Sequence, residues 1–248
     1  MPLKCWSAIV IVAAIVLGAR SAHAQAGLFP DFFELERPGH AVATTFGGGF
    51  GSDKYGTVEE GFQLEQSVTP YIGMFGRATG YQLWIGSGFL SPLNPDSGSH
   101  ARLNFGRLQG GIDFAPLQNL HLFVSAGHDL ADSDGWVFEA DLSSWLFVRT
   151  RHPLSFSFSA LYNSQNAVTS AEIDLQAVLL TRGTYMLLAG AGGAIYGGGF
   201  LSGVSGQSGP DLTFYYRPWA IGISAQAGYG DAHRYGQLAI FKQFAWHE

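Results

Sequence analysis

Cysteine, charge and long apolar runs are all scarce in this chain of 248 residues. Its one cysteine, Cys5, cannot form a disulfide within the chain. Charged residues make up 13% of the sequence, whereas about a quarter is usual in soluble proteins. After residue 24 no apolar run reaches the roughly 18 residues that a membrane-spanning helix needs. These absences exclude a disulfide scaffold and a helical membrane protein.

Several chemical motifs are absent too. The sequence has no Gly-x-Ser-x-Gly elbow, no set of His and Cys at metal-binding spacing and no glycine-rich phosphate loop that precedes a helix. The segment 129–135 has three carboxylates, but Leu130 falls at the first ligand position of a calcium loop. These carboxylates are therefore expected to be solvated. We expect no metal and no cofactor, and we assign no residue a catalytic role.

The N-terminus has the pattern of a secretory signal. Lys4 precedes an apolar run from Trp6 to Gly18, and Ala22-His23-Ala24 fits a cleavage site. The apolar run is too short to span a bilayer, so we expect residues 1–24 to be removed. Removal takes Lys4 and Arg20 from the 13 basic residues and leaves eleven against 19 acidic ones. This negative charge argues against a nucleic acid as a partner.

Alternation of apolar and polar residues dominates the rest of the sequence and is clearest between residues 154 and 179. In the run 154–162 the even positions are apolar and most odd positions are serine. In the run 171–179 the odd positions are apolar, while Glu172, Asp174 and Gln176 occupy even positions. Successive side chains of a strand point to opposite faces, so each run predicts a strand with one apolar face.

The same pattern predicts an all-β fold of about twelve antiparallel strands in up-and-down order. The breaks after even-numbered segments are short, and those after odd-numbered ones are longer and rich in Gly, Ser, Asp and Asn. Short turns at one end and long loops at the other are typical of a transmembrane β-barrel. We predict strands at 40–50, 57–69, 71–86, 101–115, 119–130, 136–149, 153–164, 169–182, 184–198, 210–217, 219–229 and 234–246.

The last segment, 235–246, places Leu238, Ile240, Phe244 and Trp246 on one face. It resembles the aromatic-ended final strand of bacterial outer-membrane β-barrel proteins, although Lys242 interrupts the apolar face. The resemblance is to the general class and singles out no family. It implies a place in the bacterial outer membrane, contact with outer-membrane lipid and recognition of this strand by the barrel assembly machinery.

The resemblance also divides the chain into three parts. Residues 1–24 are the cleaved signal peptide, and residues 40–248 form the barrel. The segment 25–39 does not alternate and contains Pro30 near its start. We expect it to be a periplasmic segment or a plug in the lumen.

If the apolar faces meet lipid, the opposite faces line the lumen, where function is expected. We expect a bulge near Gly106 in the predicted strand 101–115. Because a bulge shifts the alternation of faces, only one of Arg102 and Arg107 can be assigned to the lumen from the pattern. Carboxylates of this set gather toward the loop end and predict an acidic upper lumen. The candidate pore-lining residues are Glu59, Glu65, Arg102, Arg107, Asp113, Glu139, Asp141, Glu172, Asp174 and Arg217.

Three functions are consistent with this arrangement. Carboxylates in a pore favour cations or hydroxyl-rich neutral solutes, so a narrow pore for small polar solutes or an exported glycan is the first. The same carboxylates could instead pair with the arginines inside a non-conducting structural or surface-interaction barrel. A membrane-embedded lipid-modifying enzyme would need a serine activated by His121, His128 or His152, and we favour it least.

Overall fold

A computed structural model describes residues 41–52, 55–85, 101–117, 119–131, 135–164, 168–197, 204–230 and 233–246. Twelve antiparallel strands form one closed barrel in which every strand pairs with its neighbours in sequence and β1 pairs with β12. The fold class, the strand number and the up-and-down order are as predicted. The predicted signal peptide and the segment 25–39 lie outside the described residues.

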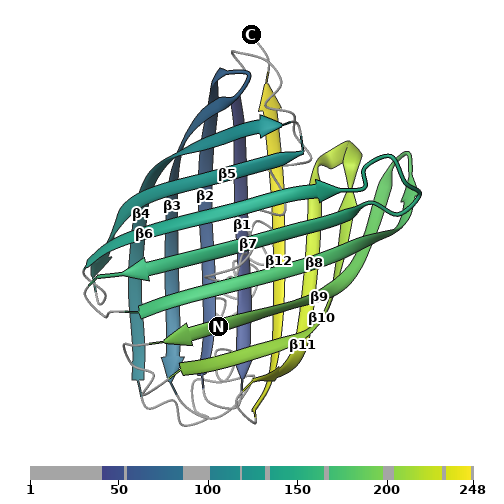
Figure 1. The fold of residues 1–248 in the computed structure, drawn as a ribbon. Helices are drawn as coiled ribbons and strands as arrows, with labels where there is room; N and C mark the ends of the chain where they lie inside the picture. The colour runs from purple at the N-terminus through teal and green to yellow at the C-terminus, as the bar shows by residue number, and fades with distance from the viewer. Residues whose placement is uncertain are drawn as a thin grey trace, which may run out of the picture.

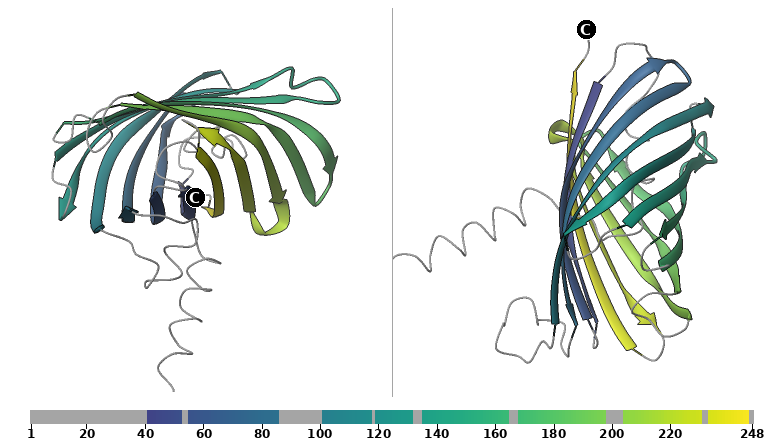
Figure 2. Two further views of the ribbon diagram at one scale, coloured as in Figure 1. Left: turned by 90° about the horizontal axis from the view of Figure 1, so that it is seen from below. Right: turned by 90° about the vertical axis from the view of Figure 1, so that its left-hand side faces the viewer.

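The strands follow one another around the barrel, with β4 to β9 strongly tilted relative to β1, β2 and β12 (Figure 1). Seen from below, they form a ring around the interior (Figure 2). No helix among the described ranges has the length and hydrophobicity of a membrane span. The strands are β1 (Ala41–Ser52), β2 (Tyr55–Thr69), β3 (Ile72–Ile85), β4 (Ala101–Leu117), β5 (Leu120–Ala131), β6 (Gly135–Leu146), β7 (Leu154–Asn163), β8 (Val168–Arg182), β9 (Tyr185–Gly197), β10 (Val204–Tyr216), β11 (Ile221–Gly230) and β12 (His233–Trp246).

Two strand boundaries differ from the prediction by more than two residues. Strand β10 begins at Val204 and not at residue 210, because Pro210 continues the strand and pairs with Ala191 of β9. Strand β6 ends at Leu146, since Phe147 adopts a positive φ and turns the chain. The connection from β6 to β7 is therefore long, and the predicted sorting of short turns and long loops is less regular than expected.

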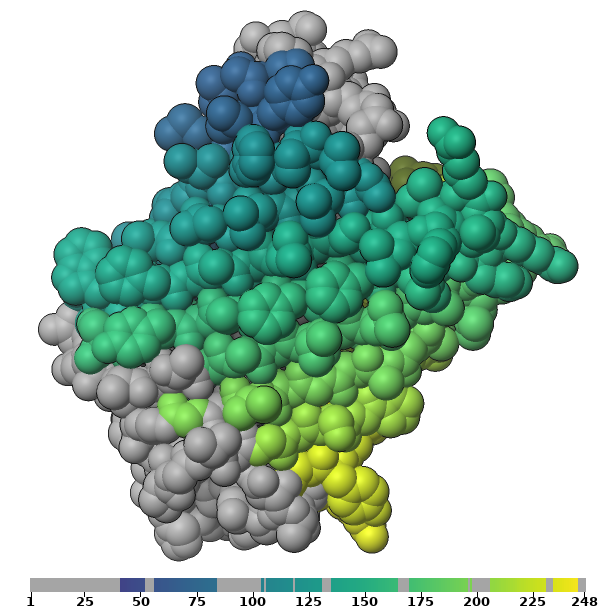
Figure 3. Space-filling view, in the orientation of Figure 1, coloured from purple at the N-terminus to yellow at the C-terminus, as the bar shows by residue number. Residues whose placement is uncertain are grey.

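The two faces of the barrel wall have opposite chemistry. Large apolar side chains on the outer face are 38–67% exposed, and they include Phe62, Met74, Ile112, Phe158 and Ile223. Inner-face side chains, most of them polar, are almost fully shielded. The side chains of the teal and green strands cover one outer face continuously in Figure 3. An exposed apolar belt of this kind is suited to lipid and not to water.

Aromatic residues lie near both ends of this belt. Trp136, Tyr162 and Tyr229 are exposed at the loop end, and Trp219 is exposed at the end that carries both termini of the barrel. His128 faces outward and makes an edge contact with Trp136, at 5.2 Å between ring centroids. Aromatic residues at these positions are typical of the girdles that flank the apolar band of a transmembrane β-barrel.

Three inward-facing aromatic rings lie flat over glycines of neighbouring strands. A Cβ added at Gly222 would lie 1.8 Å from Cε1 of Phe241, and one added at Gly61 would lie 2.5 Å from Cζ of Phe46. Phe75 covers Gly111 in the same way. Each of these rings therefore packs against a glycine of the neighbouring strand, where a larger residue would overlap it.

An apolar cluster fills part of the interior nearer the terminal end. Its buried members come from β1, β8, β9, β10 and β12, which lie within one continuous run of strands from β8 to β1. Tyr215 and Phe241 stack in it at 5.9 Å between ring centroids. This inner apolar cluster consists of Phe46, Val178, Met186, Leu188, Tyr215 and Phe241, with Trp145 and Ala220 packed against it.

Candidate functional site

The inner wall holds most of the residues predicted to line the lumen. Each of them is buried from solvent and belongs to a strand position that faces the interior. The inward-facing residues of the predicted set are Glu59, Glu65, Arg107, Asp113, Glu139, Asp141, Glu172 and Asp174.

One predicted arginine, Arg217, does not belong to this set, and for another, Arg102, the structure does not describe the side chain. Arg217 is exposed in a short 3-10 turn, Arg217–Trp219, which Pro218 starts between β10 and β11. The register of β3 with β4 runs without interruption from Ile85 and Ala101 to Ile72 and Phe114, so the bulge expected near Gly106 is absent there. Arg102 and Arg107 therefore have opposite parity, and the side chain of Arg102 lies outside the described residues.

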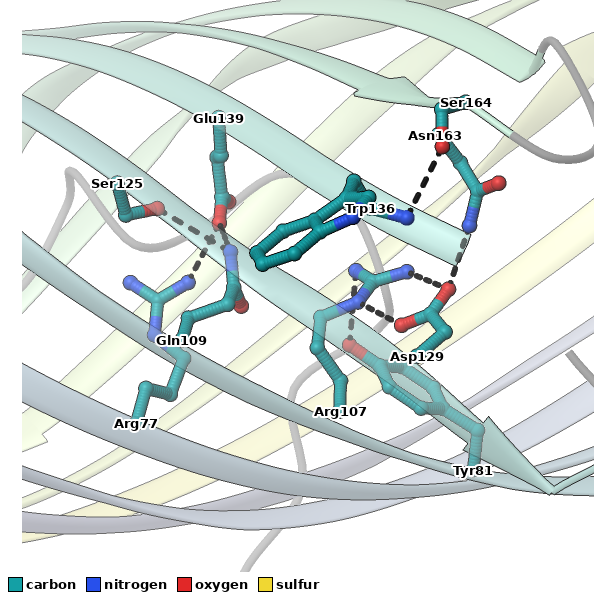
Figure 4. Close-up of polar contacts among 10 residues, drawn as sticks. All are labelled: Arg77, Tyr81, Arg107, Gln109, Ser125, Asp129, Trp136, Glu139, Asn163 and Ser164. Atoms are coloured by element: carbon teal, nitrogen blue, oxygen red, sulfur yellow. Dashed lines mark hydrogen bonds and ion pairs between the residues drawn. The ribbon is translucent and has the colours of Figure 1, made fainter. Parts of the chain in front are cut away.

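Strands β3 to β6 carry the first of two ion-pair networks on the inner wall. Arg77 Nη1 donates to Glu139 Oε2 at 2.9 Å, and Gln109 Nε2 donates to the same oxygen at 2.7 Å (Figure 4). Arg77 Nε also donates to Gln63 at 3.0 Å, and Gln109 contacts Ser125. The arrangement offsets the charge of Glu139.

The second network binds Arg107. Its guanidinium donates to both carboxylate oxygens of Asp129, with Nε to Oδ1 at 2.6 Å and Nη2 to Oδ2 at 3.1 Å (Figure 4). Tyr81 lies beneath the guanidinium, and Asn163 Nδ2 donates to Asp129 Oδ2. Asp129 was expected to be solvated in a loop, but it lies within β5 and is 1% exposed. We call the inner wall of β3 to β7 the paired sector.

A buried histidine lies in the same part of the wall. His121 Nδ1 lies 3.1 Å from Asp113 Oδ2, and His121 is directly opposite Ser143 on β6. All three side chains are almost fully buried. We assign this group no catalytic role.

The inner wall of β8 to β12 is built differently, and we call it the acidic sector. Gln176, Gly190, Asp211, Gln226 and Gln237 are opposite one another in register and form one row across five strands. Gly190 has no side chain, so Gln176 reaches across it and donates to Thr213 of β10 at 3.1 Å.

Several acceptor oxygens of the acidic sector lack donors in the described structure, although Gln176 Nε2 donates to Asp174 Oδ2 at 3.4 Å. Asp174 and Asp211 are close enough for their carboxyl groups to interact directly. Oδ1 of Asp174, both carboxylate oxygens of Asp211 and Oε1 of Gln176 are buried and accept no hydrogen bond of good geometry in the described structure. The hydroxyl of Tyr235 is also unpaired and lies within electrostatic reach of these carboxylates.

Basic side chains do not offset this charge from inside. The described basic residues of β8 to β12 and their turns are exposed or lie on the outer face, where Lys242 Nζ lies 4.8 Å from the ring centroid of Phe244. These residues are Arg182, Arg217, Arg234 and Lys242. Among the described residues, the inner wall of β8 to β12 therefore has carboxylates and no inward-facing lysine or arginine.

The sequence prediction missed Asp211 and Asp129. The alternation of Asp211 with Thr213 and Tyr215 could have placed Asp211 on the inner face, because all three have the same parity. Among the described residues no group of three or more His, Cys, Asp or Glu side chains has the arrangement of a metal site.

No protein-family model matches the chain, and no curated protein matches its sequence. Solved structures match its fold. An outer-membrane channel from Pseudomonas putida F1 has a TM-score of 0.55 at 11% identity, over 84% of this chain and 96% of that one. The translocator domain of the autotransporter NalP from Neisseria meningitidis has a TM-score of 0.54 at 8% identity, over 83% and 88%. The KdgM porin has a TM-score of 0.51 at 8% identity, over 82% and 99%.

These proteins differ in what their names say they do, and at such low identity the likeness concerns the fold alone. The chain has the fold of a bacterial outer-membrane β-barrel, as its sequence predicted. Its function has to be argued from its own inner wall.

Proposed function

We propose that the chain forms a narrow pore in the bacterial outer membrane for small polar solutes, with a preference for cations or hydroxyl-rich neutral molecules. The observation that carries this proposal is the acidic sector, where buried Asp174 and Asp211 face the interior without an inward-facing cation in the described part of β8 to β12. Carboxylates that line a pore favour cations and solutes that donate hydrogen bonds. An exported glycan is the alternative solute.

The geometry supports a narrow passage. Eight strands leave an interior filled by side chains and sixteen leave an open channel, so twelve strands lie between these limits. The inner side chains are almost fully shielded, whereas a wide channel would expose its lining. Aromatic rings packed against Gly61, Gly111 and Gly222 add bulk to the inner wall.

The membrane assignment follows from the outer face. We propose that outer-membrane lipid covers the apolar belt, and that the barrel assembly machinery recognises β12. Lipid packs against apolar side chains, and an aromatic girdle marks each boundary of the belt. Unheated protein is then expected to migrate faster than boiled protein on SDS gels and to fractionate with the outer membrane. A soluble pool that needs no detergent would contradict the assignment.

Conductance in planar bilayers tests the pore. The protein is expected to form small channels that prefer cations, and Asp174→Asn with Asp211→Asn is expected to lower that preference while the barrel still folds. Glu139→Gln is the matched comparison, because Arg77 and Gln109 already offset that carboxylate. An open channel whose ion preference ignores Asp174 and Asp211 would refute the role of the acidic sector.

A non-conducting structural barrel is the second candidate, and the inner apolar cluster favours it. This cluster places apolar side chains in the interior, and apolar constrictions can exclude water from a pore. If the wild-type protein does not conduct, Met186→Ala with Leu188→Ala is expected to open a path. Conductance in the wild type would show that the cluster constricts the passage without closing it.

A further inference from the structure

The acidic sector has more buried acceptors than donors. Four oxygens on Asp174, Asp211 and Gln176 accept no hydrogen bond of good geometry in the described structure. Asp211 is 6% exposed and Gln176 is 1% exposed, so bulk water does not readily satisfy them. Buried acceptors without donors are costly, and buried carboxylates without a counter-charge are costlier. A ligand that fits here brings both hydrogen-bond donors and positive charge.

Glycines of β9 lie between the two carboxylates, so no side chain separates Asp174 from Asp211. Asp174 is opposite Gly192 and Asp211 is opposite Gly190, so β9 presents bare backbone between β8 and β10. A Cβ at Gly192 would lie 2.7 Å from the side-chain nitrogen of Gln226 and 3.5 Å from Cγ of Asp174. Any larger residue would therefore occupy the space that these polar groups share.

A second, independent observation points to a ligand at the same place. The hydroxyl of Tyr235 on β12 is buried and unpaired in the described structure. It lies within electrostatic reach of Asp211, Glu172 and Asp174, and its ring stacks on Phe50 at 5.7 Å between centroids. A stacked aromatic ring therefore holds a buried hydroxyl within electrostatic reach of these carboxylates.

We propose that the acidic sector binds a primary ammonium group, and that the solutes of the proposed pore include small hydroxylated amines. An ammonium group supplies three donors and one positive charge, which matches the surplus of acceptors on Asp174, Asp211 and Gln176. The described side chains do not form a set of metal ligands, which favours an ion held by hydrogen bonds. Amides of Gln226 and Gln237 lie in the same row and can bind the hydroxyl groups of such a solute.

Anionic solutes fit the interior less well. Both described inward arginines are already bound, Arg77 by Glu139 and Arg107 by Asp129. A carboxylate solute would have to displace one of these buried partners. The inference deepens the proposed function, since it names a solute class for the same interior.

The test compares glucosamine with glucose and N-acetylglucosamine on the full-length folded protein. The three sugars have similar size, and only glucosamine carries an ammonium group. Calorimetric titration in detergent is expected to show glucosamine binding at least tenfold tighter than either neutral sugar, because charge-assisted hydrogen bonds are the stronger ones. Equal binding of glucose and glucosamine, or no binding, would overturn the proposal.

Matched variants locate the site. Asp211→Asn and Asp174→Asn are each expected to weaken glucosamine binding on the order of tenfold to a hundredfold. Asp141→Asn is the control, because this buried aspartate belongs to the paired sector within electrostatic reach of Arg77. An equal loss in the control would place the ligand elsewhere and refute the assignment.

Conductance separates this inference from the proposed function. Glucosamine is expected to block single-channel currents at concentrations where glucose does not. Binding by calorimetry without any channel activity would refute the pore and support the site. Open channels with no glucosamine binding would support the pore and refute the site.

Discussion

The paired sector and the acidic sector are two parts of one barrel wall, yet their buried charges have different surroundings. In the paired sector Arg77 and Arg107 each bind a carboxylate and further polar partners. In the acidic sector Asp174 and Asp211 interact with each other, and glycine replaces the side chains between them. The ion pairs of the paired sector stabilise the wall, whereas the acidic sector retains buried acceptor oxygens that accept no hydrogen bond in the described structure. Function is therefore expected in the acidic sector.

The largest expected effect comes from breaking the paired sector. Asp129→Ala leaves Arg107 buried without its carboxylate and should lower the free energy of unfolding by about 3–5 kcal/mol. Asp174→Ala, the same change in the acidic sector, should cost far less because it orphans no cation. Urea unfolding of both variants in lipid vesicles measures the difference. Equal losses would mean that the two sectors do not differ as described.

The outer face offers the next largest effect. Phe158→Arg places a charge in the apolar belt and should cost about 2–4 kcal/mol if this position lies near the bilayer midplane. Ser157→Arg should cost less, because Ser157 faces inward opposite Asp174. The same vesicle unfolding experiment compares them. A greater loss at Ser157 would reverse the assignment of faces.

Substitution of a glycine that an aromatic ring covers should have a smaller effect on stability, and this effect is independent of charge. Gly222→Ala should cost about 1–3 kcal/mol, since the new methyl overlaps the ring of Phe241. Gly183→Ala is the control, because nothing lies within 4 Å of an added Cβ there. Adding Phe241→Leu to Gly222→Ala should restore part of the loss. Full stability of Gly222→Ala alone would show that the ring does not pack against this glycine.

Alternation in the sequence predicted the strands and most of their faces, because each face meets a different environment, but it wrongly placed Arg217 in the lumen. It predicted that Glu139 and Asp174 point inward, but it could not predict their partners. Arg77 and Glu139 belong to β3 and β6, and the tilt and register of the intervening strands bring them together. The predicted start of β10 was wrong because proline usually interrupts a strand, whereas Pro210 lies within β10.

The smallest expected effect comes from Asp211→Asn, and its sign is informative. The asparagine keeps the shape of the side chain and removes a buried negative charge beside Asp174. Repulsion and desolvation both disfavour that charge in the folded state, so the free energy of unfolding should stay unchanged or rise. Asp129→Asn, by contrast, should lower it, because the charge removed there binds Arg107.

A loss of stability in Asp211→Asn would mean that the aspartate has a partner that stabilises the fold, and the acidic sector would then be structural. A gain, together with weaker glucosamine binding, would show that the chain retains a carboxylate that its fold does not need. Such a residue is expected at a binding site, since a ligand and not the protein supplies the missing donors and charge. The sign of the change in the free energy of unfolding of Asp211→Asn therefore distinguishes a structural role of the acidic sector from a role in binding a solute.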